Sequence, residues 1–377
     1  MKEEKKYDEN LDTPSIQITV PRRLTIILTA IALGIMVYFF HQIGIDDIID
    51  SITTANLILV LFSVILYLLA KFWDSLGWGE ILKIMEIRPS WISLYRVHIT
   101  SLAASIALPS AGAVETGLKI FLGTKEFPNH QKNRNATPAE ILSSIVLIRT
   151  IALFLAIPLS LIVAVGAIEY LKLPSDWGRQ LVIVISLLSL ILIVILVGIS
   201  IKPTVIIQVV KSLTVGLGKI KRLKSFSIRL QSTLLEGIEE YRQTFRFIII
   251  NKKRAFLALL LILLNNLFVW ISAFCLVLAV EKTNIPFLLI VVVVVLAGFL
   301  DMIPLGIPNA EGIKEITITE LLSRGGISDS GAAASAVLLS LTRFYLLAAF
   351  GIVFLFSMGI LHHSNRHVEI NNENYDN

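Results

Sequence analysis

Seven ionisable side chains stand within or beside strongly apolar stretches of the sequence, and their types suit the binding of an anionic group. They are Glu115, Arg149, Asp301, Glu311, Lys314, Glu315 and Arg343. Guanidinium and ammonium groups hold phosphate through charge-assisted hydrogen bonds, and a nearby carboxylate balances that charge or relays a proton. A charge at the centre of a bilayer costs about 2.5–3.5 kcal/mol or more. These side chains therefore need either partners or a wet cavity.

The same arrangement of charges occurs in both halves of the chain. The first half contains PSAGAVE, which ends in Glu115 and is followed by an apolar helix that carries Arg149. The second half contains PLGIPNAEGIKE, which ends in Glu315 and is followed by an apolar helix that carries Arg343. This internal repeat predicts one Glu–Arg pair in each half. The pairs would either clamp a hairpin to a helix or line a cavity, and the sequence leaves both roles open.

Proline and glycine interrupt the apolar pattern just before each repeated glutamate. Broken backbone at membrane depth is tolerated only inside protein or beside a water-filled cavity. The helix that follows such a break would direct its positive dipole end into that cavity, with Ser110 and Asn309 as candidate N-caps. We therefore predict two helical hairpins whose turns contain Pro109 and Gly112 in the first half, and Pro304, Pro308, Asn309 and Gly312 in the second.

The composition is that of an all-α integral membrane protein. Of 377 residues, 55% are hydrophobic and only 16% are charged, compared with about 25% charged in soluble domains. Eight apolar segments predict about six spanning helices plus two re-entrant helical hairpins at 91–124 and 287–324. The predicted spanning helices cover about 24–43, 56–72, 139–165, 180–201, 255–280 and 331–360, and most approach the ~20 residues that cross a bilayer core.

Basic residues set the predicted topology, because short Lys- and Arg-rich segments stay in the cytoplasm. Segment 1–23 has five such residues and segment 202–254 has twelve, whereas loop 44–55 has none. The two repeats then have opposite orientations, forming an inverted pseudo-repeat in the plasma membrane. If both hairpins spanned the membrane instead, this charge bias would weaken. The predicted divisions are a cytoplasmic tail (1–23), a membrane domain (24–361) and a second cytoplasmic tail (362–377). Within the membrane domain, a basic cytoplasmic linker (202–254) separates repeat one (about 56–165) from repeat two (about 255–361).

Motifs for metal, cofactor or nucleotide chemistry are not found in the sequence. The single cysteine, Cys275, lies in an apolar segment, and the six histidines form no metal-ligand pattern. There is no phosphate-binding Gly-x-x-x-x-Gly-Lys-Ser/Thr loop. We therefore expect no cofactor, no metal and no enzymatic activity. We also expect no nucleic-acid partner, because the basic linker joins two membrane helices.

The repeated motifs resemble those of the lysylphosphatidylglycerol synthase transmembrane family, also called flippase-like or UPF0104. In that family a proline- and glycine-rich signature with a glutamate precedes an apolar helix with one arginine, twice in one chain. Pro308, Gly312, Glu315 and Arg343 match the second signature. The first signature is more divergent here, with Pro109 and Glu115 retained and Ile148 standing where a glutamate precedes the arginine. The resemblance covers nearly the whole chain.

This resemblance implies a membrane domain that handles lipids. Some members move aminoacylated phosphatidylglycerol between leaflets, with a separate transferase domain that makes it. No transferase follows residue 361 here, so we expect a stand-alone member that moves an anionic phospholipid or a polyprenyl-phosphate-linked lipid. Membrane lipids are then its partners, together with a separately encoded lipid-modifying enzyme or glycosyltransferase. The alternatives are a helper subunit of such a system, an ion or small-solute transporter, and an enzyme acting on a lipid headgroup.

Overall fold

The computed structural model describes residues 22–107, 113–129, 134–171, 246–281, 284–300, 310 and 312–358, and isolated positions between 180 and 235. The helices are α1 (Arg22–Ile43), α2 (Ile45–Thr53), α3 (Leu57–Ile84), α4 (Trp91–Ala107), α5 (Ala113–Glu126), α6 (Pro138–Tyr170), α10 (Lys252–Val280), α11 (Phe287–Leu300), α12 (Ile313–Arg324), α13 (Asp329–Ser340), the π-helical turn η3 (Leu341–Tyr345) and α14 (Leu346–Ser357). Strands β1 (Pro128–Asn129) and β2 (Arg134–Asn135) form a small antiparallel pair between α5 and α6. The all-α class is confirmed apart from this pair.

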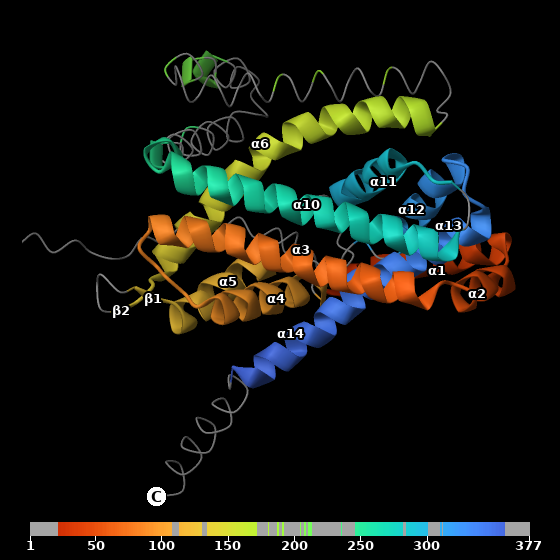
Figure 1. The fold of residues 1–377 in the computed structure, drawn as a ribbon, viewed down its shortest axis with the longest axis horizontal. Coiled ribbons are helices and arrows are strands. Elements are labelled where there is room, and N and C mark those ends of the chain that lie inside the picture. Colours follow the sequence, from red (N-terminus) through yellow and green to blue (C-terminus); the bar gives the residue numbers. More distant parts are fainter. Residues whose placement is uncertain are drawn as a thin grey trace, which may run out of the picture.

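Helices α3 and α10 lie side by side through the middle of the molecule (Figure 1). At one end the amide of Asn56 donates to the carbonyl of Ala279 over 2.8 Å. At the other end a guanidinium nitrogen of Arg254 lies 3.3 Å from a carboxylate oxygen of Glu80. The start of each helix therefore meets the end of the other, so the first long helices of the two halves are antiparallel.

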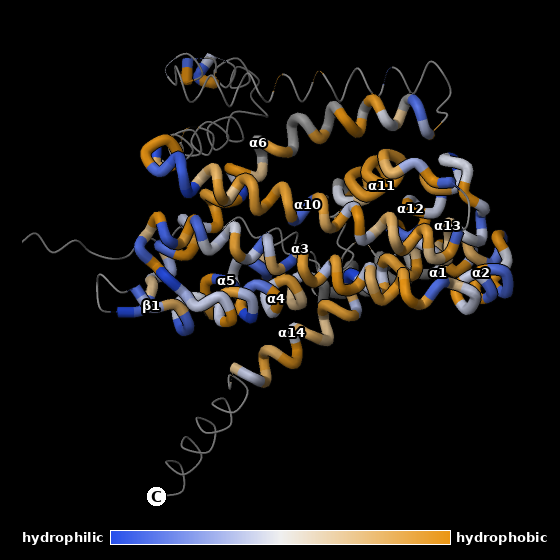
Figure 2. The backbone as a smooth tube through the Cα atoms, viewed as in Figure 1, coloured by the Kyte–Doolittle hydropathy of each residue, from blue (hydrophilic) through white to orange (hydrophobic). Residues whose placement is uncertain are grey.

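Three helices are long and apolar enough to cross a membrane, among the residues that are described: Leu57–Ile84, Lys252–Val280 and Asp329–Ser357. Figure 2 shows hydrophobic residues along most of their length. The prediction that the second spanning helix ends near residue 72 is wrong, because α3 continues to Ile84 and buries Trp78, Ile81 and Leu82. The predicted helix at 180–201 falls outside the described residues apart from isolated positions, so the count of six spans stays a prediction.

Two short antiparallel helices lie where each hairpin is predicted. The hydroxyl of Ser93, at the start of α4, donates to Glu126 at the end of α5 over 3.2 Å. Likewise Gly325, just after α12, packs against Leu289 near the start of α11. The four helices have 17, 14, 14 and 12 residues, fewer than the ~20 that span a bilayer core. In Figure 1 the hairpins flank opposite ends of the α3–α10 pair.

Each half closes with a helix that packs on the hairpin of the other half. Helix α14 crosses α4 at a glycine, where a Cβ on Gly351 would lie only 2.2 Å from the Cβ of Ala103. Helix α6 crosses α11 in the same way, since a Cβ on Gly166 would lie 2.5 Å from Val292. Small residues allow such close backbone approach between membrane helices. The last helix of each half thus packs closely on a hairpin helix of the other half at a glycine.

We expect Gly351→Ala to destabilise the fold by about 1–3 kcal/mol, because the added methyl group overpacks the α14–α4 crossing. The thermal unfolding midpoint of the detergent-solubilised protein, followed by size exclusion after heating, measures the effect. Gly34→Ala is the matched control, since nothing lies within 4 Å of the position that its added methyl group would take. Equal midpoints for Gly351→Ala and wild type would contradict this packing.

Candidate functional site

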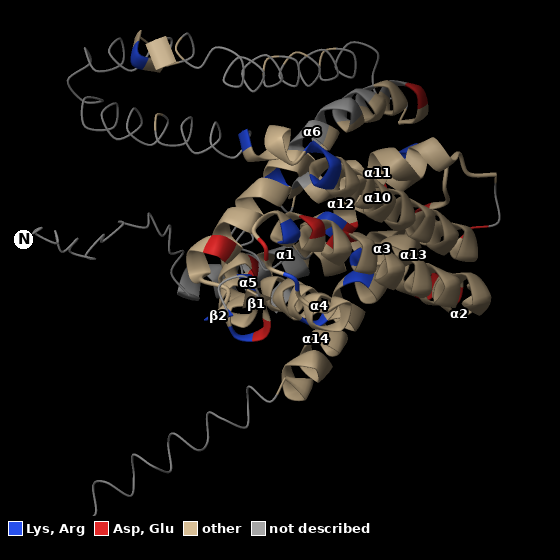
Figure 3. Ribbon diagram, turned by 60° about the vertical axis from the view of Figure 1, so that its left-hand side comes forward, with Lys and Arg blue, Asp and Glu red and all other residues tan. Residues whose placement is uncertain are grey.

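A cavity of about 120 Å³ lies between both halves of the molecule. Helices α3, α10, α11 and α12 line it together with η3 and the end of α13. Three of its lining side chains are cationic: Lys71, Lys314 and Arg343. Ser340 adds a hydroxyl group, and the remaining lining is apolar or aromatic. Figure 3 shows both basic and acidic residues among mostly uncharged helices.

The cavity lies at the middle of the long helices. Lys71 is at the centre of the 28-residue helix α3, about 20 Å from either end at a rise of 1.5 Å per residue. Its Nζ donates to the side-chain oxygen of Asn265 over 3.5 Å, and Asn265 is at the centre of the 29-residue helix α10. Sequence reasoning placed Lys71 near the end of a helix and so missed it as a site residue. If α3 spans a membrane, Lys71 lies at the depth where a charge is most costly.

Arg343 reaches the cavity from the π-helical turn η3. One guanidinium nitrogen, Nη2, donates to the carbonyl oxygen of Val269 in α10 over 3.1 Å. The guanidinium carbon lies 5.7 Å from the centre of the Tyr67 ring, within the range of a cation–π interaction. Single π-helical turns inside longer helices occur frequently at functional sites. Here the turn places Arg343 against both α3 and α10.

Lys314 and Glu315 lie in the first turn of α12 and are buried, with 4% and 6% of their surfaces exposed. The Nζ of Lys314 lies 4.3 Å from the centre of the Phe344 ring. One carboxylate oxygen of Glu315 accepts from the hydroxyl of Ser340 over 2.5 Å. The other accepts from the amide of Gly312 over 2.7 Å. Glu315 therefore joins the start of α12 to the end of α13 beside the cavity.

The backbone that leads into α12 is left-handed at two positions. Ala310 has φ 52° and Gly312 has φ 84°. Glycine adopts this conformation readily, whereas for alanine it is strained. Gly312 occupies the N-cap of α12, so the prediction that Asn309 caps this helix is wrong. The Glu315 carboxylate holds this strained backbone through its bond to the amide of Gly312. The strained backbone in turn fixes the orientation of the first turn of α12, which carries Lys314.

The contacts of the four repeated charges differ from the predicted Glu–Arg pairs. Glu115 accepts from the Nζ of Lys119 over 2.5 Å, and Nη2 of Arg149 donates to the hydroxyl of Thr116 over 2.9 Å. In the second half, Glu315 contacts Gly312 and Ser340 while Arg343 contacts Val269. The structure brings Lys314, Glu315 and Arg343 together, whereas Glu115 and Arg149 lie in the first half. The other predicted site and turn residues are outside the described part of the chain: Pro109, Gly112, Asp301, Pro304, Pro308, Asn309 and Glu311.

A second charged cluster in the first half contains the predicted site residue Glu115 together with three residues that were not predicted as site residues. Asp74 in α3 and His98 in α4 face each other, with 3.3 Å between a carboxylate oxygen and Nε2. The Glu115–Lys119 pair in α5 interacts electrostatically with both. Across the described residues, no group of three or more His, Cys, Asp or Glu side chains is arranged to hold a metal ion.

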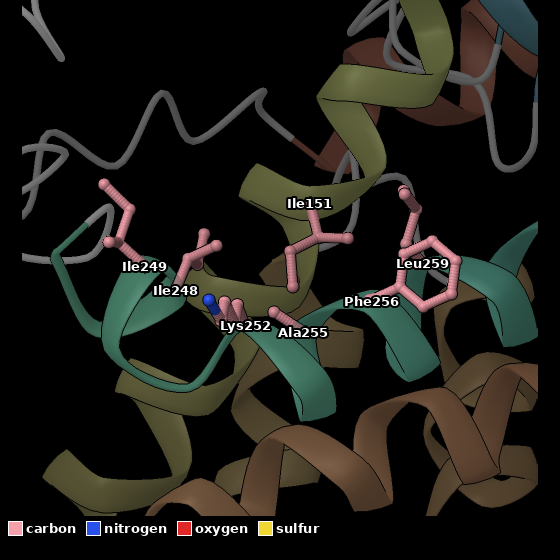
Figure 4. A pocket seen from close by; sticks show the side chains of 7 residues that line it. All are labelled: Ile151, Ile248, Ile249, Lys252, Ala255, Phe256 and Leu259. Carbon is pink, nitrogen blue, oxygen red and sulfur yellow. The ribbon is translucent and has the colours of Figure 1, made fainter.

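A larger hollow of about 350 Å³ lies between α6 and the start of α10 (Figure 4). Its lining is apolar apart from Lys252. Such an apolar surface suits an alkyl chain. It offers only one side chain, Lys252, that could bind a phosphate. The smaller cavity, with three cations, is therefore the better candidate for recognition of an anionic group.

Comparison with known proteins identifies the family of the chain. Residues 25–351 match the family described as the lysylphosphatidylglycerol synthase TM region. The chain belongs to this family. A protein from Methanothermobacter thermautotrophicus described as a UPF0104 membrane protein is 24% identical over 335 residues, which cover 87% of this chain and 93% of that protein. The family and the apolar helices together identify a membrane protein.

Proposed function

We propose that this protein moves an anionic, phosphate-containing lipid between the two leaflets of a membrane. The observation that carries this proposal is the cavity at the centre of the long helices, where Lys71, Lys314 and Arg343 converge. Three cationic side chains that converge at one cavity provide a concentration of positive charge that suits an anionic ligand. A phosphate group satisfies both the charge and the hydrogen-bonding capacity of ammonium and guanidinium groups.

The arrangement of helices supports an inverted repeat of the kind found in secondary transporters. Helices α3 and α10 are antiparallel, and each is followed by a hairpin of two short helices. If both long helices span the membrane, the hairpins enter it from opposite sides and end near its middle. In this topology both termini are in the cytoplasm, and the multi-pass protein resides in the cell membrane. Alternating exposure of the cavity to the two leaflets would then move the headgroup.

The cations of the cavity have distinct roles in this proposal. Arg343, oriented by its bond to Val269, presents its guanidinium to the phosphate oxygens. Lys314 and Lys71 supply further positive charge from opposite halves of the protein. Glu315 holds the first turn of α12 in place. Arg149 is bound to Thr116 and is not among the cavity's lining residues, so phosphate binding is assigned to Arg343 rather than to Arg149. No covalent step and no cofactor are needed.

Reconstitution into liposomes tests this function. Purified full-length protein is placed in vesicles with fluorescent phosphatidylglycerol, phosphatidylcholine or a polyprenyl-phosphate lipid, and dithionite quenching of the outer leaflet reports lipid movement. We expect protein-dependent movement of at least one anionic lipid and little movement of zwitterionic phosphatidylcholine. Equal rates for all lipids, or rates equal to those of protein-free vesicles, would reject the proposal.

Cysteine labelling tests the topology. In a Cys275→Ser background, single cysteines replace Lys125 at the end of α5 and Arg324 at the end of α12. We expect a membrane-impermeant maleimide to label position 324 in intact cells and position 125 only after permeabilisation, because the two hairpins open on opposite sides. Labelling of both positions from the same side would rule out the inverted repeat.

A further inference from the structure

Four ionisable side chains form a cluster next to the cavity and are not used in the proposed binding of phosphate. They come from three helices: Asp74 in α3, His98 in α4, and Glu115 and Lys119 in α5. Lys119 is paired with Glu115 at 2.5 Å, and its Nζ lies 5.3 Å from the centre of the Trp78 ring. The cluster therefore consists of one fixed ion pair and one Asp–His pair.

His98 is placed to accept a proton. Its side chain is only 3% exposed, and Nε2 faces the carboxylate of Asp74 at 3.3 Å. Neither ring nitrogen has a hydrogen-bond partner of good geometry among the described residues, and Nε2 is the one that lies near a carboxylate. A neutral imidazole carries a hydrogen on one nitrogen and a lone pair on the other. Because Nε2 is the nitrogen near the Asp74 carboxylate, the tautomer with its hydrogen on Nε2 is favoured there, and the lone pair of Nδ1 is then the position that takes up a second proton.

Asp74 connects this histidine to the cavity. Lys71 lies three residues before Asp74 on α3, and side chains at this spacing are neighbours on one helix face. Their charges interact, and Lys71 lines the cavity. The side chain of Asp74 is 28% exposed, so it is more accessible than His98. The carboxylate of Asp74 thus interacts with two groups: Lys71, which lines the cavity, and His98, which does not.

We propose that His98 is a proton-binding site coupled to the cavity, so that its protonation strengthens the binding of an anionic phosphate group. This inference rests on the proposed function. When His98 is neutral, the Asp74 carboxylate partly neutralises Lys71. When His98 is protonated, the new imidazolium satisfies Asp74, and the charge of Lys71 becomes available to the anion. Linkage requires the reverse effect too, so a bound anion increases the proton affinity of His98.

The other charged side chains around His98 do not carry the effect of its protonation to the cavity. On α5, Glu115 and Lys119 are already paired with each other. On α4 itself, Arg96 contacts Glu126 at 3.4 Å. Helix α14, which also packs on α4, has no ionisable side chain in its sequence LLAAFGIVFLFS. Asp74 is therefore the acidic group through which a proton on His98 acts on the cavity.

Binding measurements on the detergent-solubilised full-length protein test the coupling. The probes are dihexanoyl phosphatidylglycerol and dimethyl phosphate, which are both phosphodiester monoanions across the pH range used. Isothermal titration calorimetry compares affinities at about pH 4.5 and about pH 7.5, an interval that extends well below the usual histidine range because a buried imidazole is harder to protonate. Binding of the lipid alone would show that the acyl chains contribute, and binding of both would show that the phosphodiester group suffices.

We expect wild type to bind at least about fivefold more tightly at the lower pH, a coupling in the range usual for linked sites. His98→Gln should lose this difference, whereas His41→Gln, which changes an exposed histidine at the end of α1, should retain it. Asp74→Asn should bind tightly at both pH values, because Lys71 no longer has a competing carboxylate. This second variant keeps the test valid if His98→Gln does not fold.

The outcomes separate the two proposals. Binding with the same pH dependence in wild type and His98→Gln would overturn the coupling and leave the anion site intact. Weak, pH-dependent binding by Asp74→Asn would also overturn it. If wild type binds neither probe at either pH, the anion site of the proposed function is rejected, and the coupling falls with it.

Discussion

Replacing Arg343 with alanine is expected to reduce the rate of anionic-lipid movement in proteoliposomes by about ten- to a hundredfold. Hydrogen bonds to charged groups contribute about 1.5–3 kcal/mol, and each 1.36 kcal/mol corresponds to about a tenfold change in rate. Arg343 contacts Val269 and Tyr67, one residue from each central helix. Its guanidinium is thus held in one orientation before a ligand arrives. The initial rate of dithionite-resistant lipid movement measures the loss.

The conservative change Arg343→Lys separates geometry from charge. Lysine retains the positive charge but lacks the planar fork that binds two phosphate oxygens at once, so an intermediate rate is expected. Arg324→Ala is the matched control, because Arg324 is an exposed arginine of the same half that pairs with Glu320 at 2.7 Å. Wild-type rates for Arg343→Ala, or equal losses for Arg324→Ala, would remove Arg343 from the proposed binding role.

The hairpins could be predicted from the sequence because their signals are local. Proline and glycine interrupt an apolar run, and short helices on both sides follow from that interruption. The centre of the site could not be predicted in the same way. The sequence predicts that the spanning helix ends near residue 72, just after Lys71, since charges usually mark such ends. Only the packing of Trp78 against α6, with its indole nitrogen donating to Ser144 over 2.9 Å, shows why the helix continues.

Side-chain partners were harder to predict than elements. The repeat predicts Glu315 and Arg343 as site residues, whereas their contacts depend on the π-helical turn η3 and on the left-handed backbone at Gly312. Neither feature has a strong sequence signal: a π turn has no residue signature, and a glycine cap resembles any other glycine in a loop. The Asp74–His98 contact joins residues from two helices, and no spacing rule within one helix relates them. These contacts therefore depend on tertiary packing rather than on local sequence.

Lys71→Met is expected to abolish anionic-lipid movement while leaving the fold as stable as wild type or more stable. An ammonium group at the centre of a spanning helix costs about 2.5–3.5 kcal/mol, and methionine has a similar length without the charge. The direct contacts that Lys71 loses are weak, namely the 3.5 Å hydrogen bond to Asn265 and a 5.3 Å approach to the Tyr67 ring. Its charge interaction with Asp74 is also lost, but Asp74 keeps His98 as a neighbour. A gain in stability with a loss of activity is typical of charges kept for function.

Lys83→Met provides the control on the same helix. Lys83 lies at the end of α3 and is paired with Glu80 at 2.5 Å, away from the cavity lining. We expect this change to leave lipid movement unaltered. Thermal unfolding in detergent and dithionite assays on both variants give the comparison. A lower unfolding midpoint for Lys71→Met together with normal transport would mean that Lys71 clamps α3 to α10, and that the positive charge of the cavity has a structural role.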